Sequence, residues 1–283
     1  MSYVLLFRTH FWDDFTQRAF DRIREHAPGG SVYVAADETF REVPCPPEYK
    51  LAHSVEKFAG LGLNTTAVEQ VMWYNGDYPM YSAFLELPRF DYIIMVEFDV
   101  VVNVNFDEVI AQLKAARGDA VTRYLQPAAP DWPWKETADP VYSEVYGSLN
   151  PVLILSRKAV SNLYYARLAQ SHQYNSGKIE KWAYCEAFIA SQLKKANLKT
   201  QELDEFGRTF HFSWWPPMEE ELVLNHLRAE AFVHPVLAGD AYLKSLARYE
   251  VLPNGAANQR SQDDWDAEFR RLKRERMLEP QPG

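Results

Sequence analysis

The feature that most constrains the fold is an almost entirely apolar run, Tyr92-Ile93-Ile94-Met95-Val96. A strand that is apolar on both alternating sides must be covered on both faces, as a central strand between two layers of helices is. Polar residues resume directly after it, in Glu97-Phe98-Asp99. The run therefore predicts a central strand of an α/β sheet, with polar groups gathered at its carboxyl end.

Strand and helix patterns alternate through the first half of the chain. An apolar run at 3–7 precedes an amphipathic stretch at 13–26, and Pro28-Gly29-Gly30 separates that stretch from a second apolar run at 31–36. A strand, a helix and a strand at this spacing form a βαβ unit, and hence a parallel sheet. We expect further helices at 64–75, 80–87, 107–116, 157–169 and 181–196, and further strands at 120–124 and 151–155. The predicted fold class is α/β, with a mostly parallel sheet flanked by helices.

The charge of the chain limits its partners. The 283 residues carry a formal net charge of -9, so we expect no nucleic acid partner. An acidic protein can still bind a phosphorylated ligand through a local device such as a metal ion or a few arginines.

The cysteines and the apolar runs indicate the compartment. Cys45 and Cys185 form neither a paired metal-ligand spacing nor a disulfide framework, which suits a reducing environment. The N-terminus shows no signal-peptide pattern, and no run approaches the roughly 20 apolar residues that span a bilayer. We expect a cytoplasmic protein without a transmembrane segment, with peripheral membrane association as the alternative.

Two carboxylates, Glu97 and Asp99, lie at the strand end where α/β sheets bind ligands. Alternate residues of an extended segment point to the same side, so both can converge on one cation while Phe98 faces the other way. Hard oxygen ligands favour Mn²⁺ or Mg²⁺, and such an ion would neutralise a diphosphate. The alternative is that they are ordinary polar residues where a strand leaves the core.

Two segments carry a resemblance to a known family. Residues 91–103 resemble the DXD strand of GT-A glycosyltransferases, in a Glu-x-Asp form. The preceding run Trp73-Tyr74-Asn75-Gly76-Asp77 is similar to a stretch in a little-characterised glycosyltransferase-like family. The similarity in element order extends over roughly residues 1–240. It implies a GT-A fold and metal-dependent transfer of a sugar from a nucleotide-diphospho-sugar, with UDP-sugars favoured, to a glycan, a lipid-linked acceptor or another hydroxyl.

The resemblance also implies a domain organisation. We expect one domain over 1–252, with a nucleotide-sugar half at 1–125 and an acceptor half at 126–252. Pro, Trp and Tyr break the regular pattern between Gln126 and Asn150, which indicates a long functional loop.

The tail at 253–283 has apolar residues at helical spacing. These are Trp265, Phe269 and Leu272. We expect a terminal helix or a partly disordered tail, with a helix at an anionic lipid surface as the alternative.

Further site residues follow from the resemblance. Arg8 and Thr9 end the first strand, where GT-A enzymes seat the nucleotide, and Asp37 ends the second, where an acid contacts uracil or ribose. Asp77 is implied as a further cofactor contact, and His234 resembles the late histidine that completes a metal site with the two strand-end acids. Plain alternatives are that Arg8 pairs with an acid, that Asp37 caps a turn and that His234 is a core residue.

An inverting transfer needs a carboxylate base, for which Glu186 is our candidate. It lies among aromatic and apolar residues, which raise the pKa of a carboxyl group. A solvent-facing acid beside Lys181 is the alternative, and a retaining mechanism needs no such base. The competing loop acids are Asp131, Asp139 and Glu144.

Tryptophans in irregular segments are candidates for stacking on sugar rings. Trp132 and Trp134 are the preferred pair, and Trp214-Trp215 is the second. Both pairs have lids over the core as the alternative.

Other function classes remain open. A nucleotidyltransferase is disfavoured because no glycine-rich loop follows the first strand. A non-catalytic sugar-binding protein that retains the fold would carry the same residues.

Overall fold

The computed structural model describes residues 2–227 and 229–251. It divides into two compact units. Unit 1 comprises the chain up to Phe98 together with Val104–Arg208, and unit 2 comprises Asp99–Asn103 together with the chain from Thr209 onward. The expected tail helix with Trp265, Phe269 and Leu272 lies outside the described residues.

Unit 1 is built on a seven-stranded sheet. Its strand order is β3 (Lys50–His53), β2 (Ser31–Asp37), β1 (Tyr3–Thr9), β4 (Tyr92–Glu97), β7 (Tyr146–Ser156), β6 (Ala120–Pro127) and β8 (Thr200–Glu202). Strands β1 to β4 pair in parallel, β7 is antiparallel to both of its neighbours, and β8 is parallel to β6. Only β7 therefore runs against the common direction of this sheet.

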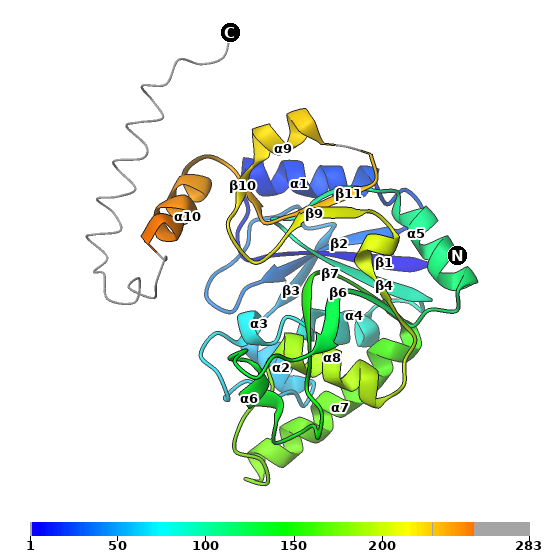
Figure 1. The fold of residues 1–283 in the computed structure, drawn as a ribbon, viewed down its shortest axis with the longest axis vertical. Helices are drawn as coiled ribbons and strands as arrows, with labels where there is room; N and C mark the ends of the chain where they lie inside the picture. The colour runs from blue at the N-terminus through cyan, green and yellow to red at the C-terminus, as the bar shows by residue number, and fades with distance from the viewer. Residues whose placement is uncertain (1, 228, 252–283) are drawn as a thin grey trace. The chain divides into compact units, whose positions relative to one another are not determined.

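Helices cover both faces of this sheet. In Figure 1, α1 (Asp14–Glu25) and α5 (Phe106–Ala115) lie on one face. The other face carries α2 (Val55–Gly60), α4 (Tyr78–Glu86), α7 (Arg157–Asn175) and α8 (Cys185–Lys195). The predicted fold class, a mostly parallel α/β sheet flanked by helices, is confirmed. No helix within 2–227 and 229–251 is both long and apolar enough to span a bilayer.

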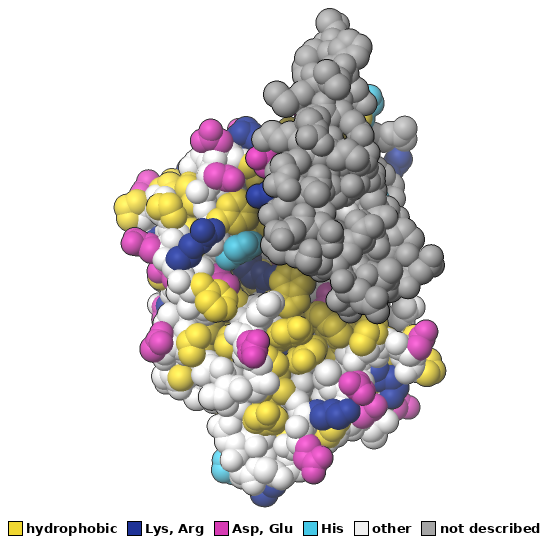
Figure 2. Space-filling model, turned by 90° about the vertical axis from the view of Figure 1, so that its left-hand side faces the viewer, with side chains coloured by type: hydrophobic (Ala, Val, Ile, Leu, Met, Phe, Trp, Pro, Cys, Tyr) yellow, Lys and Arg dark blue, Asp and Glu magenta, His cyan; other side chains and the backbone are white. Residues whose placement is uncertain are grey.

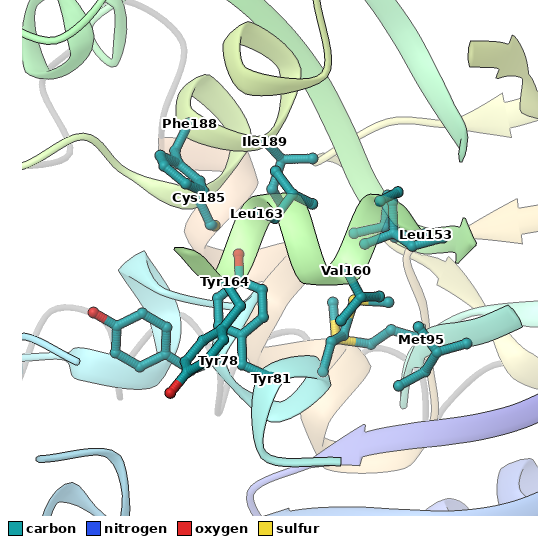
Figure 3. Packing of buried hydrophobic residues seen from close by; sticks show 14 of the residues in the cluster. Tyr78, Tyr81, Met95, Leu153, Val160, Leu163, Tyr164, Cys185, Phe188 and Ile189 are labelled. Carbon is teal, nitrogen blue, oxygen red and sulfur yellow. The ribbon is translucent and has the colours of Figure 1, made fainter. Parts of the chain in front are cut away.

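The predicted central strand is buried on both sides. Residues Tyr92 to Val96 are all buried in β4, and polar exposure begins at Glu97. Figure 3 shows the core on the face that carries α4, α7 and α8. There Met95 of β4 and Leu153 of β7 lie near Val160 and Leu163 of α7.

Helix α1 shows how a local signal sets an element. Asp13 accepts a hydrogen bond from the Thr16 backbone N–H at 2.9 Å, and the Thr16 hydroxyl accepts one from the Asp13 N–H at 2.8 Å. This capping box satisfies backbone donors that the first helical turn leaves open. Phe15, Phe20 and Ile23 then face the sheet as buried residues. The predicted amphipathic helix is confirmed.

Some predicted helix boundaries are wrong. In the helix expected at 64–75, only α3 (Val71–Tyr74) is helical. The Asn64 side chain instead accepts hydrogen bonds from the N–H groups of Thr66 and Ala67, both at 2.9 Å, which closes a local turn. The helix expected from Lys181 begins at Cys185.

The long loop predicted at 126–150 is shorter than expected. Strand β6 extends to Pro127 and β7 begins at Tyr146, because these ends pair with each other across two register irregularities. The connection between them contains one short helix, α6 (Lys135–Ala138).

Unit 2 is assembled from segments far apart in sequence. Its three-stranded sheet has the order β5 (Val101–Asn103), β11 (Ala231–His234) and β9 (Arg208–Phe212). Strands β10 (Met218–Glu219) and β12 (Val236–Leu237) form a second pair, and the helices are α9 (Glu220–His226) and α10 (Gly239–Val251). Antiparallel pairing sets Val101 opposite Val233, and both join a small core with Val223 and Val236.

A buried histidine in unit 1 has no hydrogen-bond partner among the described residues. His53 ends β3, is 1% exposed and stacks on the Phe58 ring at a centroid distance of 5.5 Å. Neither of its ring nitrogens is bonded. Burial, reinforced by the nearby charge of Lys57, lowers the pKa of His53 to about 3.

We expect His53 to make the protein sensitive to acid. Its pKa in the unfolded chain is about 6.5, so the unfolded state gains a proton below that pH before the folded state does. The free energy of unfolding should fall by about 1.4 kcal/mol per pH unit below 6.5, or about 2 kcal/mol at pH 5. Urea unfolding at pH 7 and pH 5 measures this fall in the free energy of unfolding. The fall should be absent in His53→Leu, whereas a variant at the exposed His172 should retain it. Equal pH dependence in His53→Leu and the unmodified protein would contradict the assignment.

Candidate functional site

The predicted nucleotide and metal residues of unit 1 lie at one edge of its sheet. Arg8, Asp37 and Glu97 stand at the carboxyl ends of β1, β2 and β4, which run in parallel. Arg8 and Glu97 are register partners, and Arg8 Nη2 lies 2.7 Å from Glu97 Oε1. The structure therefore pairs Arg8 with an acid, which is the alternative that the sequence left open.

Gly76 allows the Arg8 guanidinium to take this position. A Cβ atom on Gly76 would lie 2.1 Å from Arg8 Nη1 and 3.6 Å from the Sγ atom of Cys185. A side chain at this position would displace the guanidinium from its present place. Gly76 therefore lies close to both Arg8 and Cys185, the first residue of α8.

The candidate base Glu186 follows Cys185 in the first turn of α8 and is half-buried. The Ser148 hydroxyl of β7 donates to the Glu186 backbone carbonyl at 3.4 Å. The first turn of a helix stabilises a negative charge, which a base must carry. Because β7 is antiparallel to β4 and Val152 lies opposite Val96, Ser148 lies towards the carboxyl end of β4. Its hydrogen bond to Glu186 therefore places the start of α8 near the same sheet edge as Arg8 and Glu97.

The competing acids have more open surroundings. Asp131, Asp139 and Glu144 are exposed, and Asp139 forms an ion pair with Lys135 at 2.7 Å. Of these four candidate bases, Glu186 alone is half-buried.

Four half-buried rings form an aromatic shelf in unit 1 beside the start of α8. They are Tyr74, Trp132, Trp134 and Tyr184. The centroids of Tyr74 and Tyr184 are 4.2 Å apart, and those of Trp132 and Trp134 are 6.0 Å apart. Figure 2 shows hydrophobic side chains gathered on the side of the molecule that carries α3 in Figure 1.

The sequence identified two members of the shelf and missed two. Trp132 and Trp134 were predicted to stack on a sugar ring, and in the structure their two rings stack on each other. Tyr74 and Tyr184 were missed as stacking residues, although each adjoins a segment already singled out, Asn75-Gly76-Asp77 and Cys185-Glu186 respectively. Their proximity depends on tertiary packing that the sequence spacing does not show.

In unit 2, two of the predicted metal ligands lie together. Asp99 Oδ2 is 3.5 Å from His234 Nε2, and both side chains are mostly buried. The second oxygen of Asp99, Oδ1, is buried and has no hydrogen-bond partner in the described part of the chain. A hydrogen bond from the Val236 N–H to the Asp99 backbone carbonyl, at 2.7 Å, holds the segment in place.

This arrangement fits a divalent cation. Ligands of an octahedral ion with bonds of about 2.1 Å lie about 3 Å apart, close to the observed separation of Asp99 and His234. A buried carboxylate oxygen without a donor is costly unless a ligand satisfies it. Glu97 precedes Asp99 in the chain with only Phe98 between them.

Two other residues that were predicted to contact the nucleotide form hydrogen bonds within local turns instead. The Thr9 hydroxyl is buried and donates to the Phe11 carbonyl at 2.7 Å. Asp37 Oδ1 accepts from the Thr39 N–H at 3.0 Å and from its hydroxyl at 2.7 Å. Asp37 therefore caps the turn after β2, as the plain alternative anticipated.

The second tryptophan pair lies in unit 2. Trp214 is 71% exposed and stacks on Trp215 with centroids 6.2 Å apart. The aromatic shelf, in contrast, belongs to unit 1.

Asp77 lies in the core rather than at an open surface. It is 1% exposed, and Arg167 contacts both of its oxygens, from Nε at 2.7 Å and from Nη2 at 3.2 Å. The Tyr81 hydroxyl donates to Asp77 Oδ2 at 2.7 Å. Both oxygens are thus engaged by protein donors, and the expected cofactor contact is replaced by a buried ion pair. Its partner, Arg167, is ninety residues away in sequence, which is why the sequence did not reveal it.

Comparison with known proteins gave structural matches only. No protein-family model and no curated protein matches the chain. Among solved structures, it is similar to a glycosyltransferase involved in glycosylation of the major capsid of PBCV-1, with 11% identity, a TM-score of 0.44 and coverage of 83% of this chain and 94% of that one. It is also similar to mouse xyloside xylosyltransferase 1 (12% identity, TM-score 0.42, 83% and 97% covered). A third match is the galactosyltransferase LgtC in complex with donor and acceptor sugar analogues (10% identity, TM-score 0.41, 81% and 79% covered). All three of these solved structures are of glycosyltransferases.

We expect Asp77→Ala to destabilise the protein strongly. It would leave the Arg167 charge buried without its counter-ion, which costs about 3–5 kcal/mol of unfolding free energy. Asp21→Ala is a suitable control, because the Asp21–Arg24 pair is largely solvent-exposed and worth at most about 1 kcal/mol. Urea unfolding measures both. A loss in Asp77→Ala no larger than in Asp21→Ala would show that the buried pair is not as described.

Proposed function

We propose that this protein is a metal-dependent glycosyltransferase that moves a sugar from a nucleotide-diphospho-sugar to a hydroxyl acceptor. The observation that carries the proposal is the pairing of Asp99 with His234, with one buried Asp99 oxygen that lacks a partner in the described residues. The family resemblance implies Glu97, two residues earlier in the chain, as the third ligand. An oxygen-rich set with one imidazole suits Mn²⁺ better than Mg²⁺.

A bound ion would supply positive charge that stabilises the leaving diphosphate. Arg8 orients Glu97 through their 2.7 Å ion pair, in the way that hydrogen-bonded partners orient ligating carboxylates. Because the protein as a whole is acidic, this local positive charge is what allows it to hold a phosphorylated donor. UDP-linked sugars are the favoured donors, as the resemblance at Arg8 and Asp37 implies.

Glu186 takes the proton from the acceptor hydroxyl in an inverting transfer. Its place at the start of α8 stabilises the carboxylate, and its partial burial limits competition from water. The aromatic shelf beside it stacks on the apolar face of an acceptor sugar, with Trp134 and Tyr184 flanking the approach. The acceptor is therefore a glycan or another molecule that presents a sugar ring.

The protein acts in the cytoplasm in this proposal. Cys45 and Cys185 are both free and buried, as expected for a reducing compartment.

We expect donor binding to require a divalent ion. Asp99→Ala should lower the affinity for a UDP-sugar in the presence of Mn²⁺ by about 10²-fold or more, because the diphosphate loses its counter-charge. EDTA should have the same effect on the unmodified protein, and the exposed Glu48→Gln variant should bind as the unmodified protein does. Isothermal calorimetry measures all three. Normal donor binding in Asp99→Ala and in EDTA would refute the metal assignment.

We expect two variants to separate proton transfer from acceptor binding. Glu186→Gln keeps the shape of the side chain but cannot accept a proton, so kcat should fall by roughly 10²- to 10⁴-fold with donor affinity unchanged. Trp134→Ala should mainly raise KM for the acceptor, because it removes a stacking ring. Steady-state kinetics at saturating donor distinguishes them. If kcat of Glu186→Gln stays near normal at saturating acceptor, Glu186 is not the base.

A further inference from the structure

Two segments far apart in the sequence are joined in the core of unit 1. One is Trp73–Asp77, at the start of α4, and the other is Trp182–Glu186, at the start of α8. A single buried arginine, Arg167 of α7, contacts both segments. Its side chain is fully buried.

Arg167 uses its planar fork in two directions. Nε and Nη2 donate to the two oxygens of Asp77, and Nη1 donates to the Ala183 carbonyl at 2.7 Å. Nη1 also donates to Gln170 Oε1 at 2.7 Å, and the Phe188 ring lies 3.7 Å from the guanidinium carbon. Arg167 therefore links the Asp77 side chain to the backbone at Ala183, shortly before Glu186.

Two more contacts join the same segments. The Trp182 indole N–H donates to Asn75 Oδ1 at 2.7 Å, and the Cys185 thiol donates to the Trp73 carbonyl at 3.9 Å. The two segments are thus joined by three connections: Asp77 to Ala183 through Arg167, Asn75 to Trp182, and Trp73 to Cys185. The side chains that form them are largely buried.

Each joined segment carries a neighbour of the candidate site. Gly76 lies against the Arg8 guanidinium, which pairs with Glu97, and Cys185 precedes Glu186. A Cβ atom on Gly76 would be near both Arg8 Nη1 and Cys185 Sγ, so these groups meet at one point. Movement of one segment against the other would alter the distance between Glu186 and the Arg8–Glu97 pair.

We propose that Arg167 and Asp77 are positioning residues, which lock the start of α8 to the start of α4 and thereby fix Glu186 relative to Arg8 and Glu97. Neither side chain is accessible to a substrate. The effect of this lock on sugar transfer rests on the proposed function; the lock itself does not.

The chemistry of the pair supports a role in geometry more than in stability. Apolar residues of similar volume often replace a buried ion pair without loss of stability, so stability alone does not explain two desolvated charges. A guanidinium offers donors in fixed directions, whereas a lysine ammonium is a point charge on a flexible stem. Reaching Asp77 and the Ala183 carbonyl at once requires the fork.

Arg167→Lys tests the proposal because it keeps the charge and removes the fork. Phe20→Ala is the control, since it truncates a fully buried ring of α1 on the opposite face of the sheet and destabilises the fold without touching the contacts of Arg167. We expect kcat to fall by about 10- to 100-fold in Arg167→Lys with donor affinity within twofold, because a misplacement of about 1 Å can cost that much. Phe20→Ala should keep its kcat at a temperature where both variants are folded. Equal loss of kcat in the two variants would overturn the proposal.

A second measurement does not depend on activity. Cys185 is buried, and burial raises the pKa of its thiol to about 12, so it should resist iodoacetamide at pH 8. Arg167→Lys should increase the rate of Cys185 alkylation at least tenfold, as followed by peptide mass spectrometry, whereas Phe20→Ala should not. Unchanged Cys185 protection in Arg167→Lys would overturn the lock.

Trp182→Phe covers the case in which Arg167→Lys does not fold. It keeps the ion pair and removes only the hydrogen bond to Asn75, so it should give a smaller increase in the rate of Cys185 alkylation. No increase would count against the lock.

If the unmodified protein transfers no sugar from any donor tested, the proposed function has failed. The alkylation rates then decide the positioning role alone.

Discussion

Parallel pairing of β1 with β4 is the interaction on which the arrangement of the site depends. Its register sets Arg8 beside Glu97, and the Phe98 N–H then donates to the Arg8 carbonyl at 3.0 Å as the last bond of this pairing. Beyond Phe98 the chain leaves this sheet and pairs with β11 as part of unit 2. Two acids separated by one residue therefore belong to different hydrogen-bonding environments, one held by an arginine and the other beside a histidine.

The central features of the fold could be predicted from the sequence because they depend on local periodicity. The apolar run of β4, the amphipathic pattern of α1 and the turn residues between α1 and β2 each specify an element by themselves. The predictions were wrong where a side chain competes with the backbone or where a distant partner extends an element. Asn64 closes a turn within the expected helix, and Tyr146 joins β7 because β6 continues opposite it.

Prediction of the candidate site was limited wherever the partner of a residue lies far away in the sequence. The acids at the end of β4 and the late histidine stay predicted metal ligands, indicated by the strand end and by the family resemblance. Asp77 could not be assigned correctly, because its environment is created by Arg167 on a helix far along the chain. The tyrosines of the aromatic shelf are also brought together only by the packing of α3, α6 and the start of α8.

The carboxylates of this protein differ in whether their oxygens already accept hydrogen bonds from protein donors, and that difference indicates which of them could still bind a ligand. Asp77 has both oxygens bonded to donors inside the core, so no capacity remains for a ligand. Asp37 has its Oδ1 oxygen engaged by Thr39. Asp99 retains a buried oxygen with no donor among the described residues, an arrangement whose energetic cost a bound cation would remove. The same sequence pattern, an acid at the end of a strand or beside a glycine, thus has different consequences, and the neighbouring donors decide which acid is available for chemistry.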